Sequence, residues 1–149
     1  MENKNFTTTI LVDQSPADVF NAINNPRSWW SEEIDGDTDK LDAEWTYRFG
    51  DNHRCKMRTT EMTPGKRVVW RVEDNYFKFT KDPGEWTGND ITFDISRQGD
   101  KTRLVFTQVG LVPDYECYTV CRDAWTGFIQ KSLHSFITTG KAQLKWYQK

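Results

Sequence analysis

The sequence predicts an α+β fold in which helices cover one face of a curved antiparallel sheet. Two observations support this prediction. From residue 45 to residue 111, apolar side chains recur at every second position through several short segments separated by turn residues. This is the period of antiparallel strands that are buried on one face. A strand with two short helices precedes this run and one long helix follows it, an order typical of α+β proteins.

The N-terminal part of the chain predicts one strand and two short helices. Residues 6–14, FTTTILVDQ, alternate apolar and polar side chains as a half-buried strand does. Ser15 is a favourable N-cap and Pro16 suits the first helical position, so a helix is expected to begin there. Pro26 ends this helix and begins the second one.

Five or six strands are predicted in the middle of the chain. The clearest segments are 45–49, 53–61, 67–73, 89–96 and 101–111. In the second of these, His53, Cys55 and Met57 share one face, and basic residues occupy the other. The basic face is expected to be solvated, which directs the first set inward.

The last element is predicted to be a helix from about residue 116 to residue 139, closed by Gly140. Cys117 and Cys121 lie four residues apart on one face of this helix. At about 100° per residue, His134 points about 140° away from Cys121, so the three side chains do not form a metal site.

Length and composition predict one domain, residues 1–149, without a strong electrostatic field. The 149 residues carry a net charge of −2, and aromatic residues reach 14% with seven tryptophans. No basic field recruits nucleic acid or an anionic membrane. We expect no secretory leader and no membrane span, and the three scattered cysteines are expected to be free thiols, so the protein is expected to be cytoplasmic.

Three further patterns have a simple structural interpretation. The segment 32–44 holds seven acidic residues, and its DGDTDK part resembles a calcium loop, but position six is Lys40 and position twelve is Thr46. An exposed acidic loop is the better interpretation. The basic residues predicted on the outer face of the sheet are Arg54, Lys56, Arg58, Lys66, Arg67 and Arg71. No aromatic residues alternate with them to stack on bases, so solubility of the strands explains them.

His53 has two chemical interpretations beside a structural one. With Cys55 and Met57 it forms a set of soft-metal ligands, although cavity lining or core is the favoured interpretation. Next to a turn, an exposed position is expected for His53. Burial beside a carboxylate would instead make it a general base.

Three stretches, taken in this order, resemble a known family. They are SPADVFNAINNPRSWW, WTGNDITFDIS with GDKTRLVFTQVGL, and AWTGFIQKSLHSFITTG. The chain resembles the helix-grip superfamily of START domains and birch-pollen allergens (SRPBCC), and in particular the branch named after the activator of heat-shock protein 90 ATPase. The resemblance implies a cup-shaped sheet gripped by the C-terminal helix. In that superfamily the cup holds lipids, hormones or polyketides, performs cyclisation, or binds a chaperone.

In the resembled fold the apolar faces of the elements converge between the sheet and the last helix, so the aromatic side chains are expected to line a cavity there; the alternative is that they simply fill the core. Ligand pockets are mostly apolar with a few placed polar groups. The expected lining residues are Trp30, Trp45, Tyr47, Cys55, Met57, Trp70, Phe93, Phe106, Gln108, Cys121, Trp125, Phe128 and Ser132. Gln108, Tyr47 and His53 are the polar groups expected to orient a ligand.

The favoured function is therefore the binding of a small apolar or aromatic molecule, with no catalytic residue, no metal and no cofactor. Two alternatives stay open: a chaperone-related interaction module, and an enzyme of the cyclase or aromatase kind that uses the same cavity. A monomer or a weak homodimer is expected. Trp146 and Tyr147 either pack back on the domain or form a dimer contact.

Overall fold

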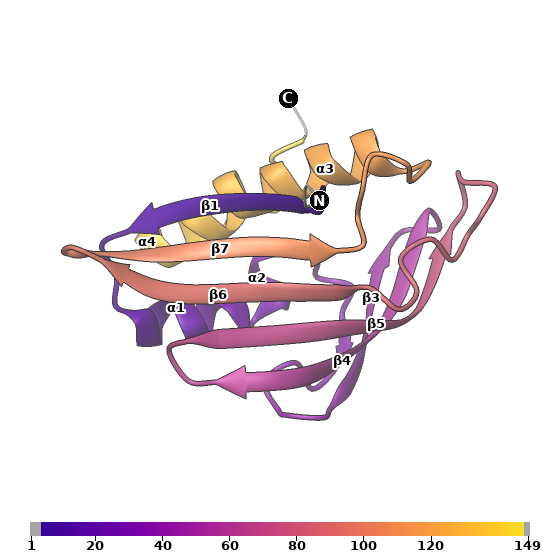
Figure 1. Cartoon of the computed structure of the whole chain (residues 1–149). Helices are drawn as coiled ribbons and strands as arrows, with labels where there is room; N and C mark the ends of the chain where they lie inside the picture. The colour runs from indigo at the N-terminus through magenta and orange to yellow at the C-terminus, as the bar shows by residue number, and fades with distance from the viewer. Residues whose placement is uncertain (1–3, 148–149) are drawn as a thin grey trace.

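The computed structural model describes residues 4–147 and has one seven-stranded antiparallel sheet with helices on one face (Figure 1). The strand order is β1-β7-β6-β5-β4-β3-β2. The elements in chain order are β1 (Phe6–Val12), α1 (Pro16–Ile23), α2 (Pro26–Trp29), β2 (Asp35–Gly36), β3 (Glu44–Phe49), β4 (His53–Thr63), β5 (Arg67–Phe77), β6 (Asp90–Gln98), β7 (Lys101–Val109), α3 (Tyr118–Gly127), η1 (Phe128–Leu133) and α4 (His134–Thr139). This is the predicted helix-grip architecture.

The N-terminal predictions are confirmed in detail. In β1, Phe6, Ile10 and Val12 are buried, Thr8 on the same face is half-buried, and the alternate residues Thr7, Thr9 and Leu11 are exposed. The Ser15 hydroxyl accepts a hydrogen bond from the Asp18 amide at 3.1 Å, so Ser15 caps α1 as expected.

The sheet is curved because β4 carries two irregularities. Its pairing with β5 shifts register between Lys56 and Met57 and again between Thr59 and Glu61. A bulge bends a strand and increases its twist. The ends of β3, β4 and β5 accordingly rise toward the level of α3 (Figure 1).

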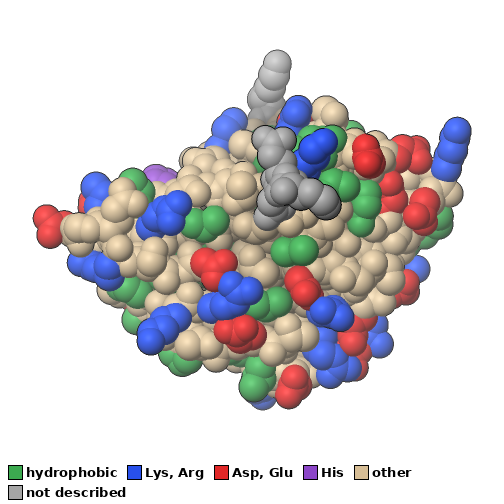
Figure 2. All heavy atoms as spheres, in the orientation of Figure 1, with side chains coloured by type: hydrophobic (Ala, Val, Ile, Leu, Met, Phe, Trp, Pro, Cys, Tyr) green, Lys and Arg blue, Asp and Glu red, His purple; other side chains and the backbone are tan. Residues whose placement is uncertain are grey.

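The outer face of the sheet carries paired charges. Of the six basic residues predicted there, four form ion pairs: Lys56, Arg58, Arg67 and Arg71. Figure 2 shows acidic and basic side chains interspersed over the face in view. Paired charges of both signs keep the strands soluble without creating a basic patch.

The acidic segment is more ordered than an exposed loop. Asp35 and Gly36 form the short edge strand β2 against β3, and Ile34 and Thr38 are buried. The Arg27 guanidinium donates to the Ile34 carbonyl at 2.8 Å and to the Gly36 carbonyl. The prediction of a loop was therefore wrong for this part, because backbone pairing and one arginine hold it against the domain.

The C-terminal helix begins at Tyr118 and ends at Thr139, and the following Gly140 has a φ of 81°, as a glycine C-cap requires. Its middle, η1, is a π-helical turn with Phe128, Ile129, Ser132 and Leu133 buried. The sequence did not reveal this widening, since apolar residues four apart suit either kind of turn. None of the helices in residues 4–147 is long and apolar enough to cross a membrane.

Candidate functional site

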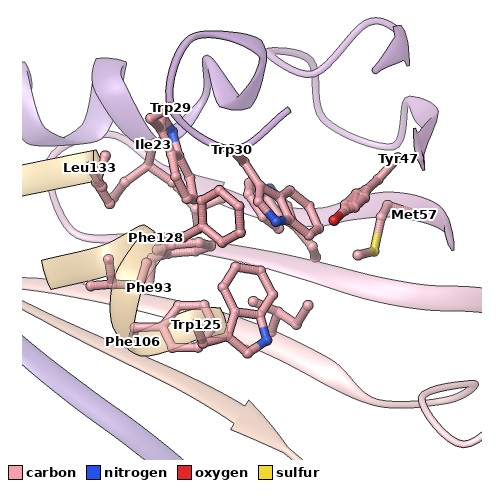
Figure 3. Packing of buried hydrophobic residues seen from close by; sticks show 14 of the residues in the cluster. Ile23, Trp29, Trp30, Tyr47, Met57, Phe93, Phe106, Trp125, Phe128 and Leu133 are labelled. Atoms are coloured by element: carbon pink, nitrogen blue, oxygen red, sulfur yellow. The ribbon is translucent and has the colours of Figure 1, made fainter. Parts of the chain in front are cut away.

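The centre of the molecule is a filled cluster of aromatic rings. Trp70 of β5 lies at ring distances of 6.3 Å from Trp29, 4.8 Å from Trp45 and 4.7 Å from Phe93. The helices and the sheet therefore meet through direct ring contacts here (Figure 3). Eight residues expected to line the cavity lie in this packed interior and do not line the cavity described below: Trp45, Cys55, Met57, Trp70, Phe93, Phe106, Gln108 and Ser132.

A cavity of about 580 Å³ lies beside this cluster, between α3 and the ends of β3, β4 and β5. Five of its lining residues were expected from the sequence: Trp30, Tyr47, Cys121, Trp125 and Phe128. The others are Phe49, Asn52, His53, Phe77, Phe79, Trp86, Val120, Asp123, Ala124, Trp146 and Tyr147. Its volume falls within the range of roughly 300–1,000 Å³ that is usual for ligand pockets.

Trp30 separates the filled cluster from the cavity. Its ring centroid lies 3.8 Å from Tyr47 and 4.8 Å from Trp125, and 5.8 Å from Trp70 in the core (Figure 3). The Tyr47 hydroxyl points toward Trp30 in this view. Burial raises the pKa of Tyr47, so the phenol stays protonated at neutral pH.

The mouth of the cavity is apolar and exposed. Phe49, Phe79, Val120 and Tyr147 retain 38%, 48%, 58% and 44% of their accessible surface, and all four line the cavity. They come from β3, the loop after β5, α3 and the C-terminal segment. Large apolar side chains left exposed together mark a binding surface more often than singly exposed ones do.

Trp86 is the main lining residue that the sequence interpretation missed. It lies in the loop between β5 and β6, yet only 3% of its surface is exposed, and it stacks on Trp125 at 5.9 Å. The segment KDPGE before it is typical of a loop, and loops rarely supply core residues. The available signal was the tryptophan itself, because a large aromatic side chain is costly to leave in water.

His53 lies in the cavity wall, the position expected of a residue that orients a ligand, and the alternative expectation that it is exposed was wrong. It is 9% exposed and packs between Phe77 at 4.2 Å and Trp86 at 4.6 Å. Its Nε2 lies 2.8 Å from Asn75 Oδ1. Burial lowers the pKa of His53 to about 4, so the ring is neutral at pH 7.

Gln108 was expected to orient a ligand, but its amide is used inside the core. Its Oε1 accepts from Trp125 Nε1 at 2.8 Å, and its Nε2 donates to Asn89 Oδ1 at 2.9 Å. Gln108 is fully buried. It therefore holds Trp125, a cavity residue, in place and does not itself reach the cavity.

The cysteines are buried free thiols. Cys121 lines the cavity, and its hydrogen bond with Cys117, together with burial, raises its pKa. Burial also raises the pKa of Cys55. Protonated thiols are weak nucleophiles and metal ligands. Within residues 4–147, no three His, Cys, Asp or Glu side chains are grouped so as to hold a metal ion.

Trp146 packs back on the domain, at the cavity mouth. Its ring contacts Phe128 at 5.5 Å and lies over Gly127, where an added Cβ would come within 2.2 Å of the ring carbons. Tyr147 contacts Phe49 at 5.8 Å. The C-terminal segment thus joins α3 to the end of β3 across the opening.

Solved structures share this architecture at low sequence identity. The Aha1 dimer from Colwellia psychrerythraea matches with a TM-score of 0.75 and 22% identity, over 93% of this chain and 98% of that chain. DynU16, described as a putative protein in the dynemicin biosynthetic locus, matches with a TM-score of 0.70 and 16% identity, over 95% of this chain and 49% of that one. CalU16 from Micromonospora echinospora matches with a TM-score of 0.63 and 14% identity, over 95% and 78%.

No curated protein matches the sequence. A family model does, over residues 13–137, and its description is "Activator of Hsp90 ATPase homolog 1-like protein". The match spans both short helices, the sheet from β2 to β7, and nearly all of the C-terminal helix. The chain belongs to this family of Activator of Hsp90 ATPase homolog 1-like proteins.

Proposed function

We propose that the protein binds a small apolar or aromatic molecule in the cavity between α3 and the ends of β3, β4 and β5. The observation that carries the proposal is an aromatic-walled space of about 580 Å³ with an uncovered apolar mouth. When a ligand fills this space, its own apolar surface and that of the mouth residues are removed from water together. Burial of apolar surface is the main favourable contribution to the free energy of apolar binding.

The charge of the lining favours an uncharged ligand. Asp123 is the one acidic residue among the lining residues, and none of those within residues 4–147 is lysine or arginine. The ionised carboxylate of a ligand that binds against such a wall loses its water without gaining a partner, which is costly. Neutral molecules are therefore preferred over fatty-acid or phosphate-bearing ones.

Two features of the relatives bear on the choice of function. DynU16 is described as a putative protein in the dynemicin biosynthetic locus, and a biosynthetic setting supports a small-molecule ligand here. The family description and the Colwellia Aha1 dimer favour a second candidate, a protein-interaction module that forms homodimers or contacts a chaperone. Ligand binding ranks first because an interaction module has no need of a hollow interior.

The proposal is tested by filling the cavity. Ala124 lies on α3 in the cavity wall, so Ala124→Trp places an indole in the ligand's space. Binding of 2-methoxynaphthalene, measured by ligand-detected NMR titration, is expected to weaken by about tenfold or more, which corresponds to about 1.4 kcal/mol.

The matched control is Leu11→Trp, a substitution at an apolar residue that is 40% exposed on β1 and does not line the cavity. It is expected to leave the affinity unchanged. Equal binding by both variants, or no binding of any neutral aromatic probe by the wild-type protein, would contradict the proposal and move support to the interaction module.

A further inference from the structure

The polar side chain most enclosed by the aromatic wall of the cavity is His53. Phe77, Trp86 and Tyr47 surround its ring at 4.2, 4.6 and 5.1 Å. The other polar groups in contact with it are Asn75 and Cys55. The titratable neighbours are thus Cys55 and Tyr47, and burial holds both of them in their neutral forms.

Asn75 determines which ring nitrogen of His53 carries the proton. The Asn75 Nδ2 group lies 3.0 Å from the Pro83 carbonyl, which only accepts hydrogen bonds, so the amide nitrogen must face Pro83 and Oδ1 must face His53. An amide oxygen also only accepts, so at 2.8 Å the His53 Nε2 must be the donor. The Cys55 thiol donates to the same Asn75 oxygen at 2.9 Å.

The other ring nitrogen, Nδ1, is consequently an unprotonated acceptor. Within residues 4–147, no group donates a hydrogen bond to Nδ1. The atom is also not among those that are completely enclosed by protein without a hydrogen-bond partner. His53 lines the cavity, and Nδ1 is the ring nitrogen that its hydrogen bond with Asn75 does not use. The low pKa of the ring keeps the acceptor available at neutral pH.

We propose that His53 Nδ1 is the specificity-determining acceptor of the cavity and that it selects neutral aromatic or alicyclic molecules bearing a hydroxyl group. The inference rests on the proposed ligand-binding function and names its ligand class. A hydroxyl donates to Nδ1, whereas an ether or a ketone presents only acceptors and leaves Nδ1 unpaired in an apolar wall. Asn75 is a positioning residue, because it acts through the tautomer of His53.

A matched pair of probes tests this preference. 2-Naphthol and 2-methoxynaphthalene share one ring system, and only the first donates a hydrogen bond. The wild-type protein is expected to bind 2-naphthol at least about fivefold more tightly, as one net hydrogen bond allows. His53→Phe keeps an aromatic ring without Nδ1 and is expected to bind both probes equally. Asn75→Leu frees the tautomer and is expected to reduce the preference.

The tautomer has a readout that does not depend on ligand or on variant folding. The nitrogen-15 spectrum of wild-type His53 at pH 7 is expected to show a pyrrole-like Nε2 and a pyridine-like Nδ1. The reverse assignment would overturn the inference. So would equal affinity of the wild-type protein for the two probes, which leaves ligand binding itself intact. Failure of both probes to bind would overturn the proposed function together with the inference.

Discussion

Two neighbouring aromatic regions of this molecule differ in what lies between their rings. Around Trp70, rings from α2, β3, β5 and β6 contact one another directly, and none of these rings lines the cavity. Around Trp86 and Trp125, a similar set of rings surrounds a cavity of about 580 Å³. Aromatic content alone therefore does not distinguish a core from a binding site.

The difference lies in what covers the sheet. Over the filled region, α1 and α2 place Ile23 and Trp29 directly on β5 and β6. At the other end, the cover is the first part of α3, the loop that holds Trp86, and the C-terminal segment with Trp146. Loops and single anchoring side chains fill space less completely than two packed helices, and so a cavity persists there.

The largest expected effect is loss of a ring from the filled region. Trp70→Ala is expected to lower the free energy of unfolding by about 3–5 kcal/mol, because the cluster cannot collapse into the space. Phe79→Ala, at a mouth residue that is 48% exposed, is expected to cost less than about 1 kcal/mol. Urea unfolding monitored by circular dichroism measures both. Similar losses for the two variants would erase the distinction between the regions.

The next effect concerns His53 at the cavity and depends on pH. Its pKa is about 4 in the folded protein, against an ordinary value of 6.5. Between these two pH values the unfolded chain binds more protons than the folded protein. The contribution of His53 to the free energy of unfolding is therefore fully present above pH 6.5 and is lost as the pH falls toward 4. The loss approaches about 3 kcal/mol.

The His53 contribution is isolated by comparison with His53→Phe. The free energy of unfolding of the wild type minus that of the variant is expected to fall between pH 7 and pH 4.5, because only the wild type has His53. The carboxylates titrate alike in both proteins. A difference that stays constant over this range would show that His53 is not buried as a neutral ring.

The smallest effect tests how the C-terminal segment packs beside the mouth. Gly127 is helical with φ of −66°, so alanine by itself favours the helix by up to about 1 kcal/mol. The added Cβ would meet the Trp146 ring, however, and Gly127→Ala is expected to destabilise the wild-type protein. In a Trp146→Ala background the same change is expected to stabilise it. A double-mutant cycle by urea unfolding measures this reversal, and the same sign in both backgrounds would show that Trp146 does not lie on Gly127.

Much of the fold could be predicted from local patterns. The Ser15 cap, the alternation in β6 and β7, and the Gly140 C-cap depend on a residue and its near neighbours, which the sequence shows directly. The π-helical turn and the pairing of Asp35 with Thr46 could not be predicted, because distant parts of the chain select them.

For the candidate site, the sequence established the chemical character of the wall but not its location. Period and residue type place Trp30, Tyr47 and Trp125 on inward faces, since an apolar stripe must be buried wherever its element lies. Whether an inward ring meets another ring or an empty space depends on the bulges that bend β4 and on the cover at each end of the sheet. Only the tertiary structure brings Asn75, Pro83 and His53 together, and with them the hydrogen bonds that place the proton of His53 on Nε2 and make Nδ1 the acceptor.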